Sequence, residues 1–126
     1  MDVYLDEKNN PWVVISLRLL EKSDIKCILD TGFSGGIALP KYYLPLVAKK
    51  TPLFSERFEF ASGEVTTFPI YTTPVRCQKK SFNVKLMFID NTTPLVGISF
   101  LKHYKLELDI PNKLIALKNF VKTSDL

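Results

Sequence analysis

An aspartate, a threonine and a glycine follow one another at Asp30, Thr31 and Gly32, directly after the apolar residues Ile28 and Leu29. This order supplies a carboxylate, a hydroxyl donor and an open stretch of backbone within one turn. Activation of a water molecule is the natural use of such a group. The competing interpretation is structural, because a turn or cap aspartate accepts hydrogen bonds from nearby backbone N–H groups.

A single carboxylate is a poor catalyst of amide hydrolysis. One group must take a proton from water while another protonates the carbonyl or the leaving amine. Two carboxylates that share one proton perform both tasks, since like charges about 3 Å apart cannot both ionise. The chain contains only one Asp-Thr-Gly triplet, so the triplet by itself leaves the second acid unaccounted for.

The other residue types that often carry chemistry lack a supporting pattern. Cys27 and Cys77 have no CxxC or Cys/His spacing, so buried free thiols are expected in place of a zinc or redox motif. His103 is the only histidine and is expected to be structural. Gly35 and Gly36 are not followed by the lysine of a phosphate-binding loop. No metal and no other cofactor is expected.

Length and charge limit the class of protein. The 126 residues predict a single domain over residues 1–126, long enough to bury about two-thirds of its unfolded surface. The net charge is +4, but the lysines are scattered, and no basic stripe indicates nucleic-acid binding. Neither a membrane span nor a signal peptide is recognisable, so a cytoplasmic location is expected.

Alternating apolar residues predict the strands that position Asp30. Apolar and other side chains alternate over residues 13–19, and again over residues 25–29 after a polar break at residues 21–24. The two runs predict a β-hairpin that places Asp30 at the end of a strand. A short strand through Leu39 follows, with Pro40 in the first turn of a short helix whose length Pro45 limits.

A second hairpin is predicted over residues 58–68. Its tip contains Ala61, Ser62 and Gly63, and Gly63 can adopt the positive φ that a tight turn requires. Pro69 and Pro74 are expected to bracket a short segment beyond it.

The remaining elements are predicted to be short. Residues 82–89 predict a strand that becomes buried on both faces, and Leu95, Val96 and Gly97 precede a short helix. Residues 106–117 predict a closing hairpin, and the tail after Phe120 is expected to be frayed or to form an association strand. These elements predict a mainly-β domain of seven to nine short strands with little helix.

The ordered set of motifs resembles the retropepsin-like aspartic proteases. Two apolar residues before Asp30-Thr31-Gly32, a hairpin with Gly63 at its tip, and Leu95-Val96-Gly97 before a short helix occur in the order seen in that family. The resemblance covers about residues 13–117, and its closing hairpin is more similar to the bacterial and cellular branch than to the viral one. It implies a closed β-barrel-like fold with a flap hairpin and one or two short helices.

The same resemblance implies an aspartic endopeptidase that acts as a homodimer on extended peptides. Asp30 of each subunit would supply one catalytic carboxylate, so the two-fold interface would provide the missing second acid. The Thr31 hydroxyl would tie the two loops together, and Gly32 would let the substrate backbone approach. The hairpin that carries Ala61, Ser62 and Gly63 would be the flap.

The sequence departs from the viral pattern beside the triplet. Viral members usually continue with Ala and Asp and pair that Asp with an Arg after the second glycine, whereas this chain has Phe33, Ser34 and Ile98. Both halves of the ion pair are absent, whereas a damaged site would leave one charge buried and unpaired. Phe33 also changes the shape of the nearest substrate pocket.

Two other functions stay open on the sequence. One is a catalytically inactive retropepsin-fold dimer that binds peptides or a partner protein. The other is a small β-barrel ligand-binding protein in which the triplet is coincidental. Cleavage that a statine-type transition-state mimic inhibits would identify the protease. Peptide binding without product would indicate the first alternative, and a monomer in solution the second.

Overall fold

The computed structural model describes residues 2–18, 22–47 and 50–119 of the chain. In this part of the chain the elements are β1 (Val3–Leu5), β2 (Pro11–Arg18), β3 (Lys22–Leu29), β4 (Ile37–Pro40), the 3₁₀ helix η1 (Lys41–Val47), β5 (Phe54–Glu59), β6 (Val65–Cys77), β7 (Lys80–Ile89), β8 (Leu95–Val96), α1 (Ile98–Leu101), β9 (Tyr104–Asp109) and β10 (Leu114–Asn119). The mainly-β prediction is confirmed. The described residues form ten strands, more than the seven to nine predicted, because β1 and β8 are too short to show a period.

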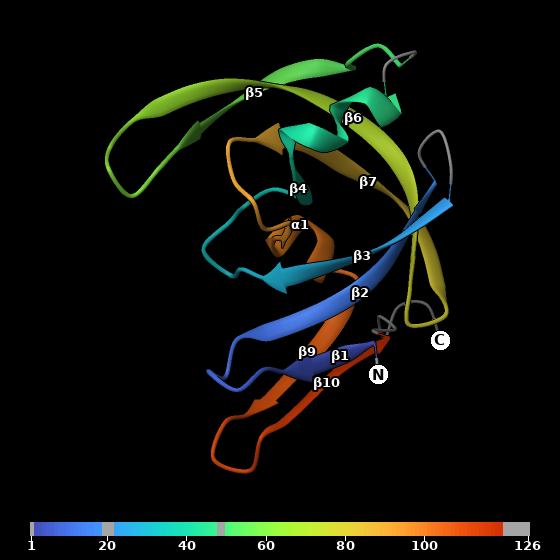
Figure 1. The fold of residues 1–126 in the computed structure, drawn as a ribbon, viewed down its shortest axis with the longest axis vertical. Helices are drawn as coiled ribbons and strands as arrows, with labels where there is room; N and C mark the ends of the chain where they lie inside the picture. Colours follow the sequence, from blue (N-terminus) through green and yellow to red (C-terminus); the bar gives the residue numbers. More distant parts are fainter. Residues whose placement is uncertain (1, 19–21, 48–49, 120–126) are drawn as a thin grey trace, which may run out of the picture.

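Eight of these strands form one sheet in the order β1-β2-β3-β8-β4-β7-β6-β5. An additional antiparallel pairing joins β2 to β6, with Ser16 opposite Arg76 and Leu17 opposite Val75. Because of this pairing, the strands β2, β3, β8, β4, β7 and β6 form a closed cycle in which each strand pairs with the next and β6 pairs with β2. Figure 1 shows the hairpin of β5 and β6 extending from this cycle on the side where β3 ends.

The predicted period of two is confirmed in the first hairpin. Val13, Ile15 and Leu17 of β2 are fully buried, and Ile25, Cys27 and Leu29 of β3 lie in the same core. The polar break predicted at residues 21–24 is wrong for residues 22–24, which already belong to β3; residue 21 lies outside the described residues. Pairing with β2 extends the strand back to Lys22 despite its polar sequence, because Arg18 lies opposite Lys22.

Proline positions differ from the predictions in two places. Pro40 is the last residue of β4, and the short helix begins one residue later, at Lys41. Pro69 and Pro74 do not bracket a short segment, since both lie inside the 13-residue strand β6. Pro69 pairs only with β5, because pairing with β7 begins at Tyr71, and a proline is tolerated where one edge of a strand is free.

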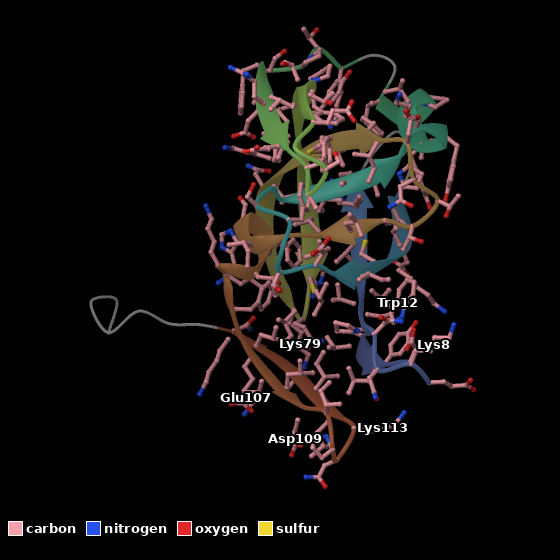
Figure 2. All side chains as sticks on the ribbon, turned by 90° about the vertical axis from the view of Figure 1, so that its left-hand side faces the viewer. Lys8, Trp12, Lys79, Glu107, Asp109 and Lys113 are labelled. Atoms are coloured by element: carbon pink, nitrogen blue, oxygen red, sulfur yellow. The ribbon has the colours of Figure 1, made fainter. Side chains whose placement is uncertain are left out.

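The closing hairpin, β9 with β10, forms a separate two-stranded sheet. Figure 2 shows it at the end of the molecule opposite the β5–β6 hairpin, with Glu107 and Asp109 along it. Its base is fixed to the main sheet by Tyr104, whose buried hydroxyl donates to the Cys77 carbonyl oxygen at 2.7 Å. The predicted tail after Phe120 lies outside the described residues.

No helix in the described ranges combines the length and the apolar character needed to cross a membrane. The cytoplasmic location stays a prediction.

The Tyr104 hydrogen bond gives a first prediction about stability. Tyr104→Phe leaves the buried Cys77 carbonyl without this donor and should lower the free energy of unfolding by about 1–3 kcal/mol. Urea denaturation followed by fluorescence measures the change. The matched control is Tyr42→Phe, because Tyr42 is 65% exposed. Equal stability of the two variants would contradict the prediction.

Both thiols are free and buried, as the sequence predicts. Burial raises the pKa of Cys27, and it raises the pKa of Cys77 to about 11. Since the thiolate is the reactive form, both residues should react slowly with a thiol reagent at pH 8 in the native state and rapidly after unfolding. Ellman's assay with and without denaturant measures this; rapid native labelling would show that the strands around them open readily.

Candidate active site

Asp30 is positioned by the parallel pairing of β3 with β8. Ile28 lies opposite Leu95 and Leu29 opposite Val96. The pairing continues past the end of the strand, because the Asp30 backbone N–H donates to the Val96 carbonyl oxygen at 2.8 Å. The structure therefore brings together the two sequence motifs, Asp30-Thr31-Gly32 and Leu95-Val96-Gly97.

The turn at residues 30–33 orients the Asp30 carboxylate. The Gly32 N–H donates to Asp30 Oδ1 at 2.9 Å, and the Phe33 N–H donates to the Asp30 carbonyl oxygen at 3.1 Å. A Cβ atom on Gly32 would lie 3.2 Å from Asp30 Oδ1, so glycine lets the carboxylate fold back over the turn. Among the described residues, the hydrogen bond from the Gly32 N–H engages only Oδ1 of the Asp30 carboxylate. Thr31 lies exposed beside it.

Glycines join the segment after Asp30 to the start of α1. The Gly97 N–H donates to the Gly36 carbonyl oxygen at 2.8 Å, and the Ser99 N–H donates to the Gly35 carbonyl oxygen at 3.1 Å. A Cβ atom on Gly97 would collide with the Gly35 carbonyl oxygen and lie 2.5 Å from that of Phe33. Gly35 and Gly36, which lack the lysine of a phosphate-binding loop, provide close backbone packing in the structure.

A cavity of about 360 Å³ opens beside Asp30. Its walls come from the segment after β3, from β4, from the end of β7 and from the hairpin of β5 and β6. Most of the lining is apolar and includes Phe33, Phe58, Phe60 and Met87. Asp30 and Glu59 are its two carboxylates, and no basic side chain lines it among the described residues.

The β5–β6 hairpin contains the hairpin predicted over residues 58–68 but is longer than predicted. It begins at Phe54, four residues before the predicted start, and β6 continues to Cys77. At the tip, Gly63 adopts φ +86°, which confirms the expected positive φ. Ala61 lines the cavity, whereas Ser62 and Gly63 lie exposed beyond it.

The aromatic residues of the cavity are not identified as site residues by the sequence motifs. The sequence predicts Phe58 and Phe60 only as members of a hairpin, and Phe33 only as a departure from the viral pattern. The available signal was the period of two, because residues 58 and 60 are two positions apart in a segment expected to be extended, where such positions share a face. Nothing in the local sequence indicates that Met87 lies opposite them.

His103 is not among the residues that line the cavity. Its ring stacks on Phe82 with centroids 4.0 Å apart, and burial together with Lys80 and Lys102 lowers its pKa. No group of His, Cys, Asp or Glu side chains within the described ranges could hold a metal ion.

Comparison with solved structures shows that the fold is retropepsin-like. A retropepsin-like aspartic protease from Rickettsia conorii matches with a TM-score of 0.64 and 22% sequence identity, over 91% of this chain and 86% of the other. The simian foamy virus (mac) protease matches with a TM-score of 0.54 and 12% identity, over 72% of this chain and 91% of the other. Searches with protein-family models and among curated proteins found no match. The predicted fold class is therefore confirmed.

Gly97 offers a test of the close backbone packing. Gly97→Ala forces a Cβ atom against the Gly35 and Phe33 carbonyl oxygens and should lower the free energy of unfolding by about 1–3 kcal/mol. Chemical denaturation measures the loss, and NMR shifts of residues 30–36 report displacement of the loop. Ser34→Ala, at an exposed position of the same loop, is the control and should change stability by no more than about 0.5 kcal/mol. An unchanged stability of Gly97→Ala would show that the two segments separate at little cost.

Proposed function

We propose that the protein is an aspartic endopeptidase that acts as a homodimer, with Asp30 of each subunit forming the catalytic pair. The observation that carries this proposal is the position of Asp30, which lies at the wall of a mostly apolar cavity bordered by a flap-like hairpin. A retropepsin-like fold supports it, since proteins of this fold include aspartic proteases.

The dimer follows from the chemistry of amide hydrolysis. Each chain has one Asp-Thr-Gly triplet, and the reaction needs a base and an acid at the same carbonyl. A two-fold axis beside Asp30 would supply the second carboxylate as a copy of the first. Glu59 also lines the cavity, but it comes from the flap arm and has no counterpart of the Gly32 N–H that orients Asp30.

The proposed reaction has no covalent intermediate. One Asp30 carboxylate is ionised and takes a proton from a water molecule, whose oxygen attacks the peptide carbonyl carbon. The other carboxyl group is protonated and gives its proton to the carbonyl oxygen, forming a neutral tetrahedral diol. The first Asp30, now protonated, then gives its proton to the amide nitrogen, while the second takes a proton from one hydroxyl of the diol. The C–N bond breaks, and a carboxylic acid and an amine are released.

The proposed substrate is a peptide in an extended conformation. The cavity lies between the β5–β6 hairpin and the sheet, and an extended peptide there could hydrogen-bond through its main chain as an additional strand. The apolar lining favours an apolar side chain next to the cleaved bond.

The catalytic assignment predicts the effect of one substitution. Asp30→Asn retains the shape of the side chain but removes the acid and base, so kcat should fall by at least about 10²-fold while the fold is retained. Cleavage of a fluorogenic peptide library measures the loss, and circular dichroism checks the fold. Asp24→Asn is the matched control, because Asp24 is an exposed carboxylate on the same strand, away from the cavity.

The dimer is tested by mixing the wild-type and Asp30→Asn chains. If the catalytic pair comes from two subunits, mixed dimers are inactive, and activity falls below the wild-type chain's share of the mixture. Activity proportional to that share would contradict a shared site. A monomer that loses cleavage equally with Asp30→Asn and Glu59→Gln would place both acids in one chain.

The outcome also separates the other two functions. Saturable peptide binding by a dimer, without product at any pH, would identify a peptide-binding module. A monomer whose ligand binding is unaffected by Asp30→Asn would identify a small ligand-binding protein.

A further inference from the structure

The ring of Phe33 occupies a slot that two glycines leave open. A Cβ atom on Gly35 would collide with the end of the ring and lie 2.7 Å from Cε1. A Cβ atom on Gly97 would lie 2.6 Å from Cδ2 of the same ring. Any other residue at these two positions would therefore displace the ring or the backbone.

The backbone of Phe33 is fixed as well as its ring. Its N–H donates to the Asp30 carbonyl oxygen at 3.1 Å, and its carbonyl oxygen accepts from the Ile98 N–H at 2.8 Å. These two hydrogen bonds hold the Phe33 backbone between the Asp30 turn and the start of α1.

The ring also contacts the flap arm. The centroids of Phe33 and Phe58 are 5.8 Å apart with an interplanar angle of 41°. Phe58 in turn contacts Phe68 across the hairpin at 5.9 Å, and Phe60 contacts Phe68 at 6.0 Å, both edge to face. We call these four residues, Phe33, Phe58, Phe60 and Phe68, the aromatic clasp; it connects the active-site loop to both strands of the flap.

Three members of the aromatic clasp, Phe33, Phe58 and Phe60, line the cavity next to Asp30. The Phe33 ring therefore lines the cavity and also contacts Phe58 of the flap arm. A change in the size of this ring must alter both the shape of the cavity and the contact that holds the flap.

We infer that Phe33 is a specificity-determining residue, whose ring limits the size of the apolar side chain that enters the cavity and holds the flap arm against the active-site loop. The inference rests on the proposed function to the extent that a peptide side chain is the occupant. A bulky occupant must displace the ring from Phe58, whereas a smaller aliphatic one fits beside it. Removal of the ring should therefore favour bulky side chains and loosen the flap.

The first test measures the binding of octapeptides that differ only in one central residue, Val or Trp. Binding is measured in the Asp30→Asn background, so that no peptide is cleaved. Adding Phe33→Ala should shift the ratio of the two dissociation constants toward Trp by about tenfold, and Phe33→Leu should shift it less. The control is Phe82→Ala, since Phe82 packs on Phe100, His103 and Tyr104 and does not line the cavity.

The second test follows amide hydrogen exchange in residues 54–68. Phe33→Ala should accelerate exchange in this hairpin more than Phe82→Ala does, because Phe33 contacts Phe58 of the hairpin, whereas the contacts of Phe82 are with Phe100, His103 and Tyr104. A comparable effect of the two substitutions, or an unchanged Val-to-Trp ratio, would overturn the inference. If Phe33→Ala does not fold, Phe33→Leu carries both tests.

Failure of this inference is distinguishable from failure of the proposed function. Asp30-dependent cleavage with no effect of Phe33 on size preference would leave the protease in place and remove the role of Phe33. Size-dependent binding without any cleavage would support the role of Phe33 and overturn the proposed protease activity. Absence of peptide binding and of cleavage would overturn both.

Discussion

The candidate site depends on one parallel pairing, that of β3 with the two-residue strand β8. The hydrogen bond from the Asp30 N–H to the Val96 carbonyl oxygen extends this pairing beyond the last residue of β3. It fixes the start of the turn that carries Asp30 next to Gly97, which is more than sixty residues away in the sequence. A backbone bond of this kind depends little on side-chain identity, which is consistent with the retention of the fold in the Rickettsia conorii protein at 22% identity.

Small and large residues have complementary roles around this pairing. Gly97 and Gly35 let two backbone segments approach to hydrogen-bonding distance, and the space left by their missing side chains receives the ring of Phe33. The ring in turn contacts the flap at Phe58. A dense packing of this type transmits displacement from one segment to the next, since packed interiors compress little. The Asp30 loop, the second glycine motif and the β5–β6 hairpin are therefore packed as one connected unit.

Much of the fold was predictable because burial imposes a local pattern. Alternation identified β2 and β3, and the turn chemistry of Gly63 identified the tip of the β5–β6 hairpin. The limits of β6 were not predictable, since Pro69 and Pro74 normally interrupt strands. They are accepted here because of the strand that lies beside each of them: Pro69 pairs with β5 and Pro74 with β7. Polar Lys22 belongs to β3 because its backbone pairs with Arg18 of β2 across the hairpin, and the polar side chains of residues 22–24 gave no alternating pattern to show this.

The sequence by itself determined which groups could do chemistry. It indicated Asp30 as the candidate acid, Gly32 as an open stretch of backbone beside it, and the two cysteines as buried thiols, because residue type and local alternation set these properties. Only the tertiary structure decided what surrounds Asp30. The cavity brings Phe33, Phe58 and Met87 together from three segments, and no period or spacing within one segment records which distant segment will lie opposite it.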